Sequence, residues 1–137
     1  MTPRTENPNC WIERGLIKSA AFRKLTGAAP RVLLIFFTKR QMRLEGKPGH
    51  KGWVQANNGE LIFSYGEALD PYKLSAPRFK RALSELVEYG FLDIANPSAQ
   101  LQKQCTRFAL SDRWRRYGEA DFQPASMPKG RRWALRT

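Results

Sequence analysis

The sequence predicts a small α+β domain, and three observations support this. Apolar residues recur with helical spacing in two segments that Ser or Thr can cap. Short apolar runs of strand type, bounded by Asn-Gly or polar loops, accompany them. The chain has 137 residues, of which 42% are hydrophobic, enough for one core. We expect a flexible lead-in over 1–10, one domain over 11–117 and an extended basic tail over 118–137.

Two helices are predicted before the first strand. Ser19 can cap a short helix over residues 20–25, and Thr26 can cap the next helix. In the second helix, the apolar residues at 32–37 cover most of the circumference, which predicts a central and buried position. Cations at 39–43 suit the negative end of its dipole.

A loop and a tight hairpin are predicted next. Residues 44–52 are rich in Gly, Lys and Pro, which is typical of a loop. Residues 53–56 and 60–63 have the composition of two strands. The Asn-Asn-Gly sequence at 57–59 separates them, and Asn-Gly tolerates the positive φ angles of a hairpin turn.

Two further capped helices follow. Ser64 can cap a short helix over residues 65–69, which ends before Pro71. A longer helix over 75–89 has a serine cap, a proline in its first turn and an apolar stripe on one face. Gly90 is typical of the residue that ends such a helix.

The last elements are a strand over 91–95, a polar loop over 96–104 and a returning strand over 105–110. Ser111 can cap a final short helix. This order of elements is that of the winged helix-turn-helix, a three-helix core with a small antiparallel sheet whose hairpin forms a wing. In that fold, the last core helix presents its polar face to the major groove of DNA.

The polar face of the helix over 75–89 is therefore the predicted binding site. Arg78 and Arg81 are expected to reach base edges, because a guanidinium group can bind guanine O6 and N7 together. Phosphate contacts are expected from three other residues on or before this helix: Lys73, Ser75 and Lys80. The competing interpretation leaves both arginines in solvent, with Arg81 paired to Glu85 four residues on.

Two auxiliary contacts are predicted. Lys103, in the wing loop, and Arg107, just inside the next strand, are expected to touch the flanking minor groove or backbone. Arg131 and Arg132 belong to a tail segment that carries no acidic residue, and such a segment either follows a minor groove or is a disordered basic end.

The residues that carry a resemblance to a known family are 57–65, 79–82 with 85–94, and 111–114. They resemble small bacterial winged-helix proteins related to phage and plasmid replication organisers. The resemblance supports the fold, and it implies a role in transcription control or in replication and maintenance of a mobile element. The turn at 70–73, Asp-Pro-Tyr-Lys, departs from the tighter glycine-containing link of related motifs.

The charge identifies the class of partner. The chain has 24 Lys and Arg against 12 Asp and Glu, which gives a formal charge of 24 − 12 = +12. So large an excess favours a polyanion, and double-stranded DNA is the expected partner. A protein-interaction winged helix and an RNA-binding protein are the alternatives. No membrane partner is expected, because no apolar run approaches the roughly 20 residues of a membrane helix.

No enzyme activity, cofactor or metal is expected. The single histidine, His50, falls in the glycine-rich loop, and Cys10 and Cys105 are too far apart for metal-ligand spacing. So few cysteines suit a reducing cytoplasm. Three of the four tryptophans are expected in or beside the core. A homodimer is left open, with the N-terminal segment, the helix ending near Arg43 or the tail as its interface.

Overall fold

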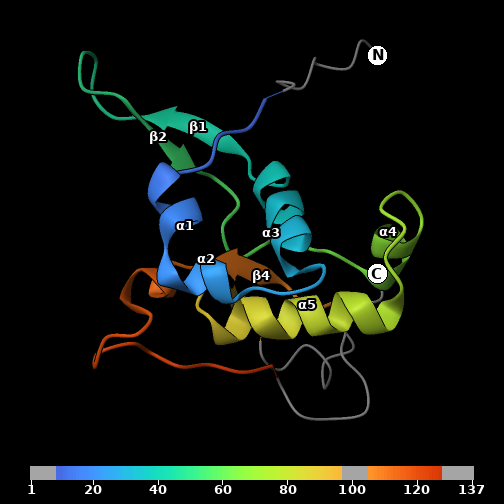
Figure 1. The fold of residues 1–137 in the computed structure, drawn as a ribbon. Helices are drawn as coiled ribbons and strands as arrows, with labels where there is room; N and C mark the ends of the chain where they lie inside the picture. Colours follow the sequence, from blue (N-terminus) through green and yellow to red (C-terminus); the bar gives the residue numbers. More distant parts are fainter. Residues whose placement is uncertain (1–8, 97–104, 128–137) are drawn as a thin grey trace, which may run out of the picture.

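The computed structural model describes residues 9–96 and 105–127, and these form a mixed α+β domain (Figure 1). Its helices are α1 (Arg14–Lys18), α2 (Ala20–Lys24), α3 (Ala29–Thr38), α4 (Tyr65–Leu69) and α5 (Ala76–Glu88), followed near the end by a 3-10 helix, η1 (Arg113–Arg116). Its strands are β1 (Met42–Glu45), β2 (Gly52–Gln55), β3 (Leu92–Ile94) and β4 (Phe108–Leu110). Most of the predicted lead-in and wing loop, and residues 128–137 of the tail, lie outside the described residues.

Two of the predicted helix caps are confirmed. The Ser19 hydroxyl accepts a hydrogen bond from the Phe22 backbone N–H at 3.1 Å, and the Ser64 hydroxyl accepts one from Glu67 at 3.2 Å. Each serine thereby satisfies one of the N–H groups that a helix start leaves without an intrahelical partner. Both caps act over three residues, the range in which sequence patterns predict best.

Of two other predicted caps, that at Thr26 is wrong and that at Ser75 is confirmed in position only. Ala28, not Thr26, occupies the N-cap of α3, and Thr26 binds a carboxylate of α5. Ser75 does occupy the N-cap of α5, but its side chain makes no cap hydrogen bond. The helix α1 was not predicted. It has five residues, of which only Leu16 is buried, so it has no helical periodicity to detect.

The first hairpin pairs different strands from those predicted. β2 pairs antiparallel with β1, so that Met42 lies opposite Gln55 and Glu45 opposite Gly52. The turn is at the tip, where the His50 N–H donates to the Lys47 carbonyl at 2.8 Å. Proline and then glycine with φ 82° stand between them, the pattern of a type II turn. Two turn signals competed here, and the Pro-Gly signal determined the strand pairing.

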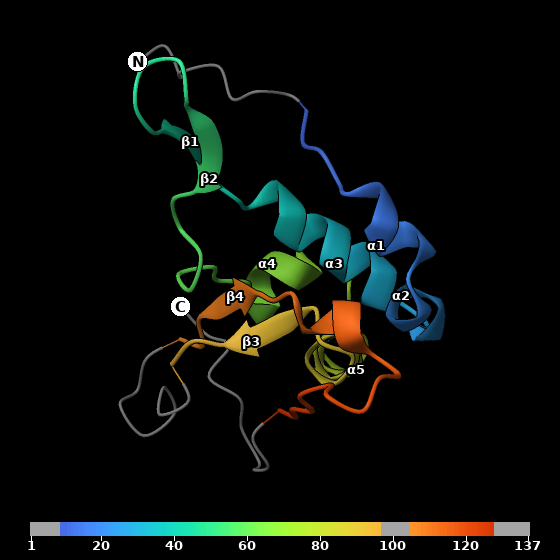
Figure 2. The same ribbon diagram turned by 90° about the vertical axis from the view of Figure 1, so that its left-hand side faces the viewer.

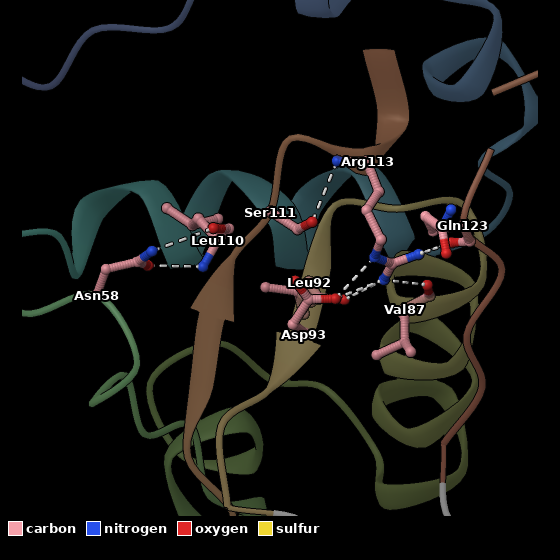
Figure 3. Close-up of polar contacts among 8 residues, drawn as sticks. All are labelled: Asn58, Val87, Leu92, Asp93, Leu110, Ser111, Arg113 and Gln123. Atoms are coloured by element: carbon pink, nitrogen blue, oxygen red, sulfur yellow. Dashed lines mark hydrogen bonds and ion pairs between the residues drawn. The ribbon is translucent and has the colours of Figure 1, made fainter. Parts of the chain in front are cut away.

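The Asn-Asn-Gly segment turns the chain without joining two paired strands. Asn57 instead closes the base of the hairpin, because its Oδ1 accepts from the Gln41 N–H at 2.9 Å and its Nδ2 donates to the Lys39 carbonyl at 2.9 Å. Asn58 binds the backbone of Leu110 in both directions (Figure 3). Both amides therefore tie separate elements together.

β3 and β4 form a second antiparallel pair, with Leu92 opposite Leu110. Leu61, predicted to pair with β2, forms an isolated antiparallel bridge with Phe108 of β4. The two residues exchange backbone hydrogen bonds of 3.1 and 2.7 Å. β4 is thus flanked by β3 on one side and by this short bridge on the other.

The core lies between α3, α5 and the β3–β4 pair, and it confirms two predicted features. α3 is largely buried, and the stripe of α5 is buried at Phe79, Ala82, Leu83, Leu86 and Val87. Aromatic rings join these elements: Phe63 lies 5.4 Å from Phe36 and 4.6 Å from Phe79, centroid to centroid. Because these rings are fully buried, they contribute a large part of the hydrophobic stabilisation.

Candidate nucleic-acid interface

The solvent face of α5 is the candidate interface. In Figure 1, α5 crosses the lower part of the molecule, with α2 and α3 above it, and Figure 2 shows it nearly end-on beside β3. One face of α5 is buried, and Arg78 and Arg81 are exposed on the other. Neither guanidinium group has a hydrogen bond or ion pair with any residue in the described part of the chain.

Glu85 takes no part in neutralising these arginines. Its Oε1 accepts a hydrogen bond from the Thr26 N–H at 2.8 Å, and its Oε2 accepts one from the Thr26 hydroxyl at 2.6 Å. The expected alternative, an Arg81–Glu85 pair, is therefore wrong for the described residues. The contact instead connects α5 to the turn before α3 and holds this carboxylate away from the cationic half of the helix.

The turn between α4 and α5 places two more predicted residues at the start of α5. Lys73 and Ser75 are both exposed. Between them, Leu74 is fully buried, and its N–H donates to the Ala68 carbonyl at 2.8 Å. The chain makes this turn without glycine because Lys73 adopts a left-handed φ of 58°. Lys80, on α5, is half-buried.

Lys73→Gly is expected to raise the free energy of unfolding by about 1 kcal/mol, because glycine has no Cβ to oppose the left-handed conformation. The same variant is expected to weaken binding to duplex DNA, because it removes a predicted phosphate contact. Lys73→Ala is the matched control, since it loses the charge and keeps the strain. Urea unfolding and duplex titration measure the two effects, and unchanged DNA affinity in both variants would remove Lys73 from the interface.

The basic cluster of η1 is engaged in contacts within the chain, although Arg115 and Arg116 are exposed. Arg115 binds both carboxylate oxygens of Glu13, and Arg116 binds Asp121. Hydrogen bonds from these arginines lower the pKa of Glu13 and of Asp121 below the usual carboxyl values. Arg113 pairs with Asp93 and with backbone carbonyls (Figure 3). These three cations are thus neutralised or satisfied internally, unlike Arg78 and Arg81.

Of the residues predicted for the auxiliary contacts, only Arg107 is among those that the structure describes. Arg107 is exposed just before β4, and its N–H donates to Asn96 Oδ1 at 2.6 Å. Lys103, Arg131 and Arg132 lie outside the described residues. The structure therefore brings together Lys73, Ser75, Arg78 and Arg81 at one end of α5.

The tryptophans differ from expectation. Trp11 and Trp53 are exposed to 59% and 66%, whereas Trp114 is buried against the Phe91 ring, 5.9 Å away. Trp133 lies outside the described residues. Because Trp11 and Trp53 are both exposed, the expectation that three of the four pack in or beside the core is wrong.

In residues 9–96 and 105–127, no three His, Cys, Asp or Glu side chains are grouped so as to hold a metal ion. Over the same ranges, no helix has both the length and the apolar character to cross a membrane. Comparison of the chain with protein-family models, with curated proteins and with solved structures finds no match.

Proposed function

We propose that this chain binds double-stranded DNA through the amino-terminal half of α5. The observation that carries the proposal is the pair Arg78 and Arg81, exposed on a helix whose opposite face is buried and without acidic partners in the described residues. Three residues apart, they are separated by about 4.5 Å along the helix axis. That separation suits contacts to neighbouring base pairs, which lie about 3.4 Å apart.

The arrangement of the surrounding elements supports a winged helix-turn-helix. α3, the Leu61 bridge, α4, α5, β3 and β4 follow one another in the order of that fold, and the β1–β2 hairpin is an addition after α3. The turn between α4 and α5 exposes the start of α5. In such folds this end of the helix enters the major groove, with its N-terminal residues at the base edges.

Arg81→Ala and Arg78→Ala test the proposal. Each is expected to reduce affinity for a selected duplex sequence by about tenfold and to relax discrimination at one base position, since a bidentate guanine contact is worth about 1–3 kcal/mol. Arg116→Ala is the control, because it removes one cation that already binds Asp121. Duplex titrations of base-substituted sequences measure the effect. Discrimination unchanged in both α5 variants would refute the readout role.

The biological role is part of the same proposal: transcription control, or replication and maintenance of a mobile element, at the bacterial nucleoid. Both roles use the same duplex contacts, so occupancy across the genome, at promoters or at an origin, distinguishes them. The mass of the protein in solution with and without duplex tests whether two copies bind together.

A further inference from the structure

The β1–β2 hairpin projects from the domain at the end opposite to α5. α3 leads from the neighbourhood of α5 to the base of the hairpin, and Figures 1 and 2 both show the hairpin beyond the far end of α3. Leu44 lies directly opposite Trp53 in the strand register, so the two side chains share one face. They are exposed to 47% and 66%. This face is therefore available to a partner that does not cover α5.

The hairpin holds Trp53 in a defined position. At its base, Ala56 N–H donates to the Gln41 carbonyl at 2.6 Å, and Asn57 closes the same end. At its tip, Gly46 has φ 121°, and a Cβ there would lie 2.5 Å from the His50 carbonyl oxygen. The tip is thus a close-packed turn, and the exposed indole stands on a preorganised scaffold that lowers the entropy lost on binding.

The charges of the hairpin indicate an anionic partner. Lys47 and Lys51 flank the turn at the tip, and the tip residues 46–51 contain no acid. The one carboxylate of the two strands, on Glu45, is paired with Arg43. A second copy of the chain would bring like charges together at this face, which opposes self-association.

We propose that the hairpin binds single-stranded DNA, with the Trp53 indole stacked on an unpaired base and Lys47 and Lys51 at the adjacent phosphates. An exposed aromatic ring beside cations is the combination that binds single strands, because every unpaired base offers a face for stacking. In a duplex, those faces are covered by neighbouring base pairs. The choice of DNA over RNA rests on the proposed function of α5.

The test uses the full chain and a fluorescent oligo(dT) strand of about 20 nucleotides, longer than a usual single site. Trp53→Ala is expected to weaken binding by about tenfold, and Trp53→Phe to retain most of the affinity, because a phenyl ring still stacks. Leu69→Ala is the control, since Leu69 is a similarly exposed apolar side chain on α4, outside the hairpin. Thermal unfolding of Trp53→Ala should match that of the wild type.

Two further sets of variants distinguish binding at the hairpin from binding at α5. Lys47→Ala and Lys51→Ala should each make the salt dependence of oligo(dT) binding shallower by about 0.7. The double variant Arg78→Ala, Arg81→Ala should lose affinity for duplex DNA and keep affinity for oligo(dT). If this variant keeps its duplex affinity while the hairpin variants behave as expected, only the α5 proposal is refuted. Four results would overturn the hairpin proposal. The first two are an oligo(dT) affinity that Trp53→Ala leaves unchanged, and binding of oligo(U) that is tighter than binding of oligo(dT). The others are competition by polyglutamate as strong as that by a nucleic acid of the same charge, and a dimer that Trp53→Ala dissociates while oligo(dT) binding is unaffected.

Discussion

Gly90→Ala is expected to destabilise the domain by about 3 kcal/mol, the combined cost of a strained backbone and of overpacking. Gly90 has φ 93°, a conformation that residues with a Cβ rarely adopt. An added Cβ would lie 2.5 Å from the Trp114 backbone nitrogen and 2.8 Å from the Arg113 carbonyl carbon. Because these are backbone atoms, the start of η1 would have to move away from α5.

Gly118→Ala separates the two causes. Gly118 has φ 89°, yet an added Cβ would meet no atom within 4 Å, so this variant carries the cost of the backbone conformation alone, about 1 kcal/mol. Urea unfolding monitored by circular dichroism measures both variants. Equal losses of stability at the two positions would contradict a close approach of Gly90 to η1.

Arg113→Ala is expected to lower the free energy of unfolding by about 3 kcal/mol, because it removes the donor to a carboxylate and to two part-buried carbonyls. The Arg113 side chain is 16% exposed and lies 2.7 Å from Asp93. It also donates to the carbonyls of Val87 at 2.9 Å, Leu92 at 2.8 Å and Gln123 at 2.8 Å (Figure 3). One guanidinium therefore joins the end of α5 to β3 and to the segment after η1.

Arg116→Ala is the matched control for this variant as well. Its ion pair with Asp121 is exposed, and removal of such a pair changes stability by about 1 kcal/mol or less. Arg113→Lys keeps the charge and loses the planar fork, so we expect it to recover less than half of the lost stability. Similar unfolding midpoints for Arg113→Ala and Arg116→Ala would refute the assigned role of Arg113.

Local signals in the sequence predicted much of the fold. The caps at Ser19 and Ser64 depend on contacts three residues away, and the buried stripe of α5 depends on helical periodicity alone. The pairing of β2 was not predictable in this way. Two turn sequences, around Gly49 and around Gly59, lie within a dozen residues, and local propensity cannot decide between two possible partners for one strand.

For the candidate site as well, local sequence patterns predicted some features, and contacts between distant residues determined the others. The exposure of Arg78 and Arg81 follows from the position of the apolar stripe, and the structure agrees. The roles of Glu85 and Arg113 depend on partners far away in the chain: Glu85 binds Thr26, 59 residues earlier, and Arg113 binds Asp93, 20 residues earlier. No spacing rule connects such pairs. The sequence alone therefore does not distinguish the arginines of η1, which bind other parts of the chain, from Arg78 and Arg81 of α5.

The closed base of the β1–β2 hairpin has a consequence for how this chain can change. Gln41 and Ala56 are hydrogen-bonded to each other, so the chain leaves the domain and returns to it at almost the same point. An insertion or deletion at the tip need not displace any core residue, and closing a longer loop costs little entropy. The β1–β2 hairpin is thus a separable module. Its length is free to vary in evolution, and its tip can accept a peptide tag, while the remainder of the domain keeps its architecture.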